Sequence, residues 1–188
     1  MERLFNPLES ASRLQGILTT AGIESIVIGG IAVAIWGEPR ATKDADLKVL
    51  IQRDQSARLI KALPSEFHLL SKEPEETLQR LGFLFVQDVT GIRLDLLLAE
   101  TAFDAEAVAR GIQMEPLPGI KMKVCTPEDL IIYKIISTRP RDHEDAAGIV
   151  NRQKDVLNEK YIENWLKQFE QALNDSTLVS SYHAMQRR

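Results

Sequence analysis

The chain of 188 residues carries a formal net charge of −4 and is 44% hydrophobic. This length suits one domain with a helical appendage, and the hydrophobic content suffices for a core. Because the net charge is negative, the overall composition does not indicate a nucleic-acid-binding protein, although a local basic patch would be enough to bind RNA.

The single cysteine, Cys125, excludes an intramolecular disulfide. No apolar run approaches the about 20 residues of a membrane span, and no signal peptide is visible. We therefore expect a cytoplasmic protein that makes no use of a membrane.

Periodicity, turn residues and caps predict strands and helices in mixed order over the first two thirds of the chain. We expect helices at residues 8–21, 31–36, 54–63, 74–81 and 102–110. We expect strands at residues 25–28, 44–51, 67–70, 83–88, 92–98, 113–117 and 120–125. Asp54 is the expected N-cap of the third helix.

The last third of the sequence predicts helices only. Thr126 followed by Pro127 and two acids is a strong helix start, and that helix should run to about Ser137. Asp142 is expected to start the next helix, to residue 153, and an amphipathic helix should span 159–173. The pattern is typical of an α+β protein with a mixed sheet flanked by helices. We expect residues 1–125 to form the core, 126–175 to pack on it, and 176–188 to be a flexible tail.

A glycine pair, Gly29-Gly30, ends the first apolar strand and precedes a helix. Glycine allows close approach of the backbone, and the N–H groups at a helix N-terminus bind phosphate. The alternative is an ordinary strand-to-helix turn without a ligand.

Three acids occupy two expected strands. Asp44 and Asp46 alternate with apolar residues and therefore share one face of their strand. Asp95 lies inside an apolar run, where an unpaired carboxylate is costly. Together these oxygens match the ligands that Mg²⁺ prefers, and the three groups should then converge on one cation. The alternative for Asp95 is an ion pair with Arg93, which lies two residues away on the same face.

These residues resemble a known superfamily. Gly29-Gly30, with Arg40-Ala41-Thr42-Lys43-Asp44-Ala45-Asp46 and a third acid at Asp95, resembles the nucleotidyltransferases related to polymerase beta. With Pro127-Glu128-Asp129-Leu130 downstream, the chain resembles the narrower AbiEii-like group, which includes toxins of type IV toxin–antitoxin systems. The resemblance covers residues 23–150.

The resemblance implies transfer of a nucleoside monophosphate from an NTP to an acceptor hydroxyl, with release of pyrophosphate. Mg²⁺ or Mn²⁺ would be held by the acids Asp44, Asp46 and Asp95. The nucleotide would be bound by Gly29, Gly30, Arg40, Thr42, Lys43 and Lys134. The group also uses a helical lysine and an aspartate at the start of the next helix, which Lys134 and either Asp142 or Asp145 match. The alternatives are a snorkelling Lys134 and a capping role for the two aspartates.

The acceptor is left open. RNA, especially a tRNA 3′ end, is what toxin-like relatives suggest, and a protein or a small molecule of the aminoglycoside type is the alternative. The acidic pI of about 5.5 weighs against RNA. A catalytically silent nucleotide-binding module is a further alternative. An antitoxin partner follows from the resemblance alone.

Overall fold

The computed structural model describes residues 6–187, which divide into two compact units. The first unit comprises the chain up to Ile31 and the segment Ala41–Cys125. The second comprises Ala32–Arg40 and the chain from Thr126 onward. In the described part of the chain, no helix is both long and apolar enough to cross a membrane.

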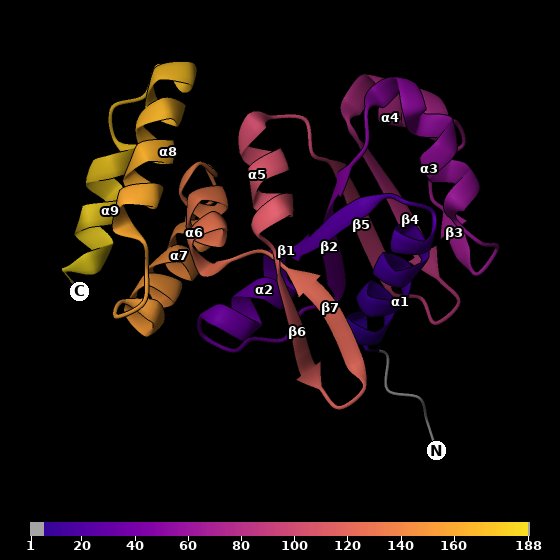
Figure 1. Cartoon of the computed structure of the whole chain (residues 1–188), viewed down its shortest axis with the longest axis horizontal. Coiled ribbons are helices and arrows are strands. Elements are labelled where there is room, and N and C mark those ends of the chain that lie inside the picture. Colours follow the sequence, from indigo (N-terminus) through magenta and orange to yellow (C-terminus); the bar gives the residue numbers. More distant parts are fainter. Residues whose placement is uncertain (1–5, 188) are drawn as a thin grey trace. The chain divides into compact units, whose positions relative to one another are not determined.

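The first unit contains a seven-stranded mixed sheet with the order β3-β4-β5-β2-β1-β7-β6 (Figure 1). Its strands are β1 Glu24–Ile28, β2 Asp44–Leu50, β3 Phe67–Leu69, β4 Phe83–Asp88, β5 Arg93–Leu98, β6 Ile112–Leu117 and β7 Ile120–Val124. The pairs β2–β5 and β1–β7 are parallel, and the other neighbours are antiparallel. Each strand lies within one residue of its predicted bounds at either end, which confirms the mixed sheet.

Helices complete the first unit. They are α1 Pro7–Thr20, α3 Ser56–Ala62, α4 Pro74–Leu81 and α5 Ala102–Arg110. Helix α1 packs on β1, β2 and β7, while α5 packs on β1 and β2. Lys48 of β2 forms an ion pair with Asp104 of α5 at 2.8 Å, so α5 lies on the sheet face that carries Lys48. The predicted cap at Asp54 is wrong: Arg53–Gln55 forms a tight 3₁₀ turn, and α3 begins only at Ser56.

The second unit is helical. Helix α2 Gly29–Trp36 begins in the first unit and ends in the second, where α6 Pro127–Ile135, α7 Pro140–Gln153, α8 Glu159–Leu173 and α9 Leu178–Gln186 follow. Helix α6 packs against α7, α8 and α9. The carbonyl oxygens of Trp36 and Gly37 accept hydrogen bonds from the side chains of Gln153 and Arg152 at 2.8 and 2.7 Å. The end of α2 is therefore fastened to the end of α7.

Two expectations for this unit are wrong. The stretch predicted to be a flexible tail forms helix α9, which packs on α7 and α8 (Figure 1). Leu178, Tyr182 and Met185 recur at helical spacing and are buried, so one face of α9 is held by the hydrophobic effect. Asp142 does not start α7, which begins at Pro140, a residue well suited to the first helical position.

Candidate active site

The turn from β1 into α2 is pressed against the start of β2. Gly29 has a φ of +63°, and a Cβ atom at this position would lie 1.9 Å from Oδ2 of Asp46. A Cβ at Gly30 would lie 2.7 Å from Oγ1 of Thr42. The antiparallel register, which pairs Ile28 with Asp46, brings the turn there. Position 29 therefore accepts only glycine, because of its positive φ and the close approach of Asp46.

The three acids lie on one face of the sheet. β2 and β5 are parallel, with Asp46 opposite Asp95 and Asp44 opposite Arg93. Half-buried and fully buried residues alternate along β2, so its acids face one side and its apolar residues face the core. Asp95 belongs to the same alternation on β5. The structure thus places the predicted acids next to one another along two central strands.

Hydrogen bonds fix the carboxylates of this face. Asp44 accepts a bond from the Thr42 hydroxyl at 2.9 Å. Both oxygens of Asp95 accept bonds from Arg93, at 2.6 Å from Nε and 2.7 Å from Nη2. The hydrogen bond to Asp95 contributes most to raising the pKa of Arg93. Burial lowers this pKa, whereas the negative charges of Asp95, Asp44 and Asp46 raise it further. The ion pair that was the alternative for Asp95 is therefore present.

The donors on this face suit a hard divalent cation by their chemistry, because all are carboxylate oxygens. Among residues 6–187, however, no three His, Cys, Asp or Glu side chains are gathered into a metal-holding group. The acids share a face and a register, while the carboxylate of Asp95 is turned to Arg93. The expected convergence on one cation is thus not formed by the side chains as they stand. Lys43 is exposed in the loop before β2.

The remaining predicted residues form a charge network inside the second unit. Lys134 of α6 is buried and donates to Asp142, and also to Asp145 at 2.9 Å. Arg40 binds both oxygens of Asp145, at 3.2 Å from Nε and 3.1 Å from Nη2. The snorkelling alternative for Lys134 is therefore wrong, since its ammonium group is held among carboxylates.

Asp142 is a fixed anion in this network. Burial on its own would raise its pKa, but hydrogen bonds from Lys134 and Ser137 and the charges of Lys134 and Arg139 outweigh burial and keep the pKa below its ordinary value. Ser137 and Arg139 donate to Asp142 at 2.6 and 2.7 Å. Asp142 thus belongs to an ion-pair network, and Arg139 takes the N-cap position of α7.

No sequence pattern singled out Phe85, which belongs to this part of the sheet. Its ring lies 4.1 Å from Cζ of Arg93, a cation–π distance, and it pairs with Asp95 across β4 and β5. In the sequence, the expected strand at 83–88 does not indicate which of its residues pair with those of β5, so the position of Phe85 next to Asp95 could not be predicted.

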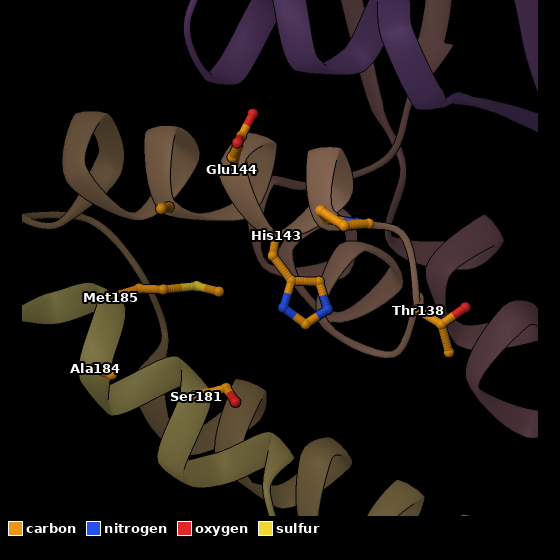
Figure 2. Close-up of a pocket in the computed structure, with 8 residues that line it drawn as sticks. Thr138, His143, Glu144, Ser181, Ala184 and Met185 are labelled. Carbon is orange, nitrogen blue, oxygen red and sulfur yellow. The ribbon is translucent and has the colours of Figure 1, made fainter.

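A separate hollow of about 560 Å³ lies between α7 and α9 (Figure 2). It is lined by Thr138, Pro140, His143, Glu144, Ala147, Ser181, Ala184 and Met185. His143 Nε2 donates to the carbonyl oxygen of Ser137 at 2.7 Å, which fixes the ring. None of the residues expected to serve the reaction lines this hollow.

No family model and no curated protein matches the chain. Solved structures do match. An antigenic nucleotidyltransferase-like protein from Paracoccidioides brasiliensis is 17% identical, with a TM-score of 0.54 over 95% of this chain and 93% of that one. ANT(2″)-Ia in complex with adenylyl-2″-tobramycin is 12% identical, with a TM-score of 0.54 over 94% and 97%. These likenesses show that the chain has the nucleotidyltransferase fold.

Proposed function

We propose that this chain is a metal-dependent nucleotidyltransferase, which moves a nucleoside monophosphate from an NTP to an acceptor hydroxyl and releases pyrophosphate. One observation carries the proposal: the glycine turn at the N-terminus of α2 lies against Asp46, on the sheet face that also bears Asp44 and Asp95. A phosphate-binding turn next to carboxylates is what this reaction requires, because the substrate brings phosphate and metal together.

Each part of the first unit has a task in this proposal. Backbone N–H groups from Gly29 and Gly30 onward bind the β- and γ-phosphates at the positive end of the helix. Asp44, Asp46 and Asp95 hold Mg²⁺ or Mn²⁺, which supplies charge neutralisation at the transferred phosphoryl group. Asp95 also orients the acceptor hydroxyl and accepts its proton.

The exposed Lys43 offers positive charge to the triphosphate, and Thr42 holds Asp44 in place through its hydroxyl. The resemblance to AbiEii-like proteins assigns Lys134 and either Asp142 or Asp145 to the same reaction, and Arg40 is a further candidate for neutralising the charge of the triphosphate. Within the second unit, Arg40 pairs with Asp145, and Lys134 pairs with both Asp142 and Asp145.

The test is transfer of label from an NTP labelled at its α-phosphate. Asp44→Asn and Asp46→Asn should each abolish transfer while the protein stays folded. Asp54→Asn is the matched control, because Asp54 is an exposed acid of the same unit in a 3₁₀ turn. If the wild-type protein with Mg²⁺ or Mn²⁺ binds none of the four NTPs in calorimetry, the proposal fails. Binding without turnover would instead indicate a silent nucleotide-binding module.

Two acceptor classes follow from different observations. The shared fold with ANT(2″)-Ia, whose complex holds an adenylylated tobramycin, favours a small molecule rich in hydroxyl groups. The resemblance to toxin-like nucleotidyltransferases favours RNA, in particular a tRNA 3′ end, and with it an antitoxin protein as partner.

Labelled NTP and cell extract distinguish the acceptors once RNA, protein and small molecules are separated. Label in RNA, together with a growth defect that Asp46→Ala removes, supports the toxin-like function. Label among small molecules supports the second class. Label in protein would indicate a protein hydroxyl, and label in no fraction would count against all three.

A further inference from the structure

Arg93 and Asp95 form a fork-shaped ion pair on one strand. They are two residues apart on β5, so their side chains share a face. Both nitrogen–oxygen distances are short, at 2.6 and 2.7 Å, and each carboxylate oxygen has its own guanidinium nitrogen. Charge-assisted, bidentate bonds of this kind are among the strongest that side chains make. Asp95 is thus held in one orientation by Arg93.

The neighbouring strand fixes the guanidinium from a second side. Phe85 of β4 is the register partner of Asp95, and its ring lies 4.1 Å from Cζ of Arg93. Phe85 itself contacts Phe83, with ring centroids 4.8 Å apart. The Arg93 side chain is nevertheless 46% exposed, whereas that of Asp95 is 15% exposed. The guanidinium is therefore well placed, yet it has an open route into solvent.

The charge of Arg93 acts on all three acids. Asp44 is its register partner on β2, and Asp46 is the partner of Asp95. Besides Asp95, the charges of both Asp44 and Asp46 raise the pKa of Arg93. Carboxylates on one face repel each other, and a cation among them offsets that repulsion. Arg93 is the cation on β5 that supplies this compensation.

We propose that Arg93 is a positioning residue that competes with the divalent cation for Asp95. This inference rests on the proposed function. With both its oxygens bonded to Arg93, Asp95 has to release at least one of them before it can ligate a cation beside Asp46. Binding of the cation and pairing with Arg93 then exclude each other in part, and Arg93 lowers the affinity of the acids for metal. The released guanidinium, whose side chain is 46% exposed, then turns its positive charge toward solvent.

The test is Mn²⁺ binding without nucleotide, measured by calorimetry and by the spin-resonance signal of free Mn²⁺. Removal of a unit charge beside a dication should tighten binding in Arg93→Gln by at least about tenfold. Arg93→Lys keeps the charge but loses the fork and the stacking, so its Mn²⁺ affinity should lie between those of the wild type and Arg93→Gln. Phe85→Leu removes only the stacking and should tighten binding by less than Arg93→Gln.

Arg53 provides the matched control. It pairs with Glu100 through a similar fork, including a bond of 2.8 Å from Nη2, and its side chain is 43% exposed. Arg53→Gln changes the net charge by the same amount but should leave Mn²⁺ affinity unchanged. Thermal unfolding followed by circular dichroism verifies that each variant is folded. If Arg93→Gln does not fold, the Mn²⁺ affinity of Phe85→Leu is compared with that of the wild type instead.

Four outcomes would overturn the inference. Affinity that is equal to or weaker than that of the wild type in Arg93→Gln means that Arg93 does not compete. Equal tightening in Arg53→Gln means that net charge alone is responsible. The absence of Mn²⁺ binding in the wild type and in every variant, Arg93→Gln included, means that Arg93 does not control metal binding, whereas the proposed function itself fails only if no NTP binds. Loss of binding in Asp44→Asn, together with an unchanged Arg93→Gln, overturns only the role of Arg93.

Discussion

Replacing Gly29 by alanine probes the contact on which the candidate site depends. The backbone at Gly29 has a φ of +63°, and an added Cβ would lie 1.9 Å from Oδ2, 2.6 Å from Cγ and 2.9 Å from Cβ of Asp46. A left-handed conformation costs a non-glycine residue about 1–2 kcal/mol. Moving packed atoms out of the way costs about 1–3 kcal/mol more. We therefore expect Gly29→Ala to lower the free energy of unfolding of the first unit by about 2–5 kcal/mol.

The two contributions can be separated within this chain. Gly91 has a φ of +88°, and nothing lies within 4 Å of a Cβ added there. Gly91→Ala should therefore cost only the backbone part, about 1–2 kcal/mol. Asp46→Ala removes the two closest atoms, so the double variant Gly29→Ala/Asp46→Ala should be more stable than the sum of the single changes by about 1 kcal/mol or more.

The assay is urea unfolding, with two signals. Both tryptophans, Trp36 and Trp165, belong to the second unit, so their fluorescence reports on that unit, whereas far-ultraviolet circular dichroism reports on the whole chain. Gly29→Ala should shift the dichroism transition and weaken NTP binding. If Gly29→Ala costs no more than Gly91→Ala, and the double variant shows no coupling, the close approach of the turn to Asp46 is refuted.

Two more predictions concern the second unit. Asp142→Asn removes one of the two carboxylates of Lys134 and should lower the free energy of unfolding at neutral pH by about 1.5–3 kcal/mol. Because the folded pKa of Asp142 lies below its ordinary value of 3.8, its stabilisation is complete above that value and is lost as the pH falls through the folded pKa. The gap between wild type and variant in urea titrations should therefore close in acid, and a gap independent of pH would contradict it. Tyr182→Ala, at a fully buried position of α9, should cost about 3–5 kcal/mol in the fluorescence-detected transition. A cost near zero there would mean that α9 does not pack.

Local signals predicted most elements of the fold. The helices at 74–81, 102–110 and 159–173 have the predicted bounds because caps and periodicity agree at those segments. Where two local signals compete, the sequence alone does not decide between them. Asp142 is a good cap, but Pro140 is a better first helical residue. In α9 the apolar spacing of Leu178, Tyr182 and Met185 was visible, but only the neighbouring helices decide that it is buried.

The candidate site was predictable up to the point where register matters. Period two along β2 places Asp44 and Asp46 on one face, whatever the rest of the chain does. The approach of Gly29 to Asp46 depends on the antiparallel register of β1 and β2. The stacking of Phe85 on Arg93 depends on the register of β4 and β5. The choice of Asp95 between Arg93 and a cation depends on the competition of charges, and spacing along the chain does not decide it.

The fastening of α2 has a consequence for synthesis on the ribosome. The segment Ala32–Arg40 belongs to the second unit, although the chain on both sides of it belongs to the first. The side chains of Arg152 and Gln153, which hold the carbonyl groups of Gly37 and Trp36, are translated more than a hundred residues later. The sheet can therefore assemble before the hydrogen-bond donors for the end of α2 have been synthesised, because domains generally fold from the N-terminus during synthesis. For the same reason the two units cannot be produced as two simple halves: a cut after Cys125 would leave Ala32–Arg40 in the first product without the helices that complete it.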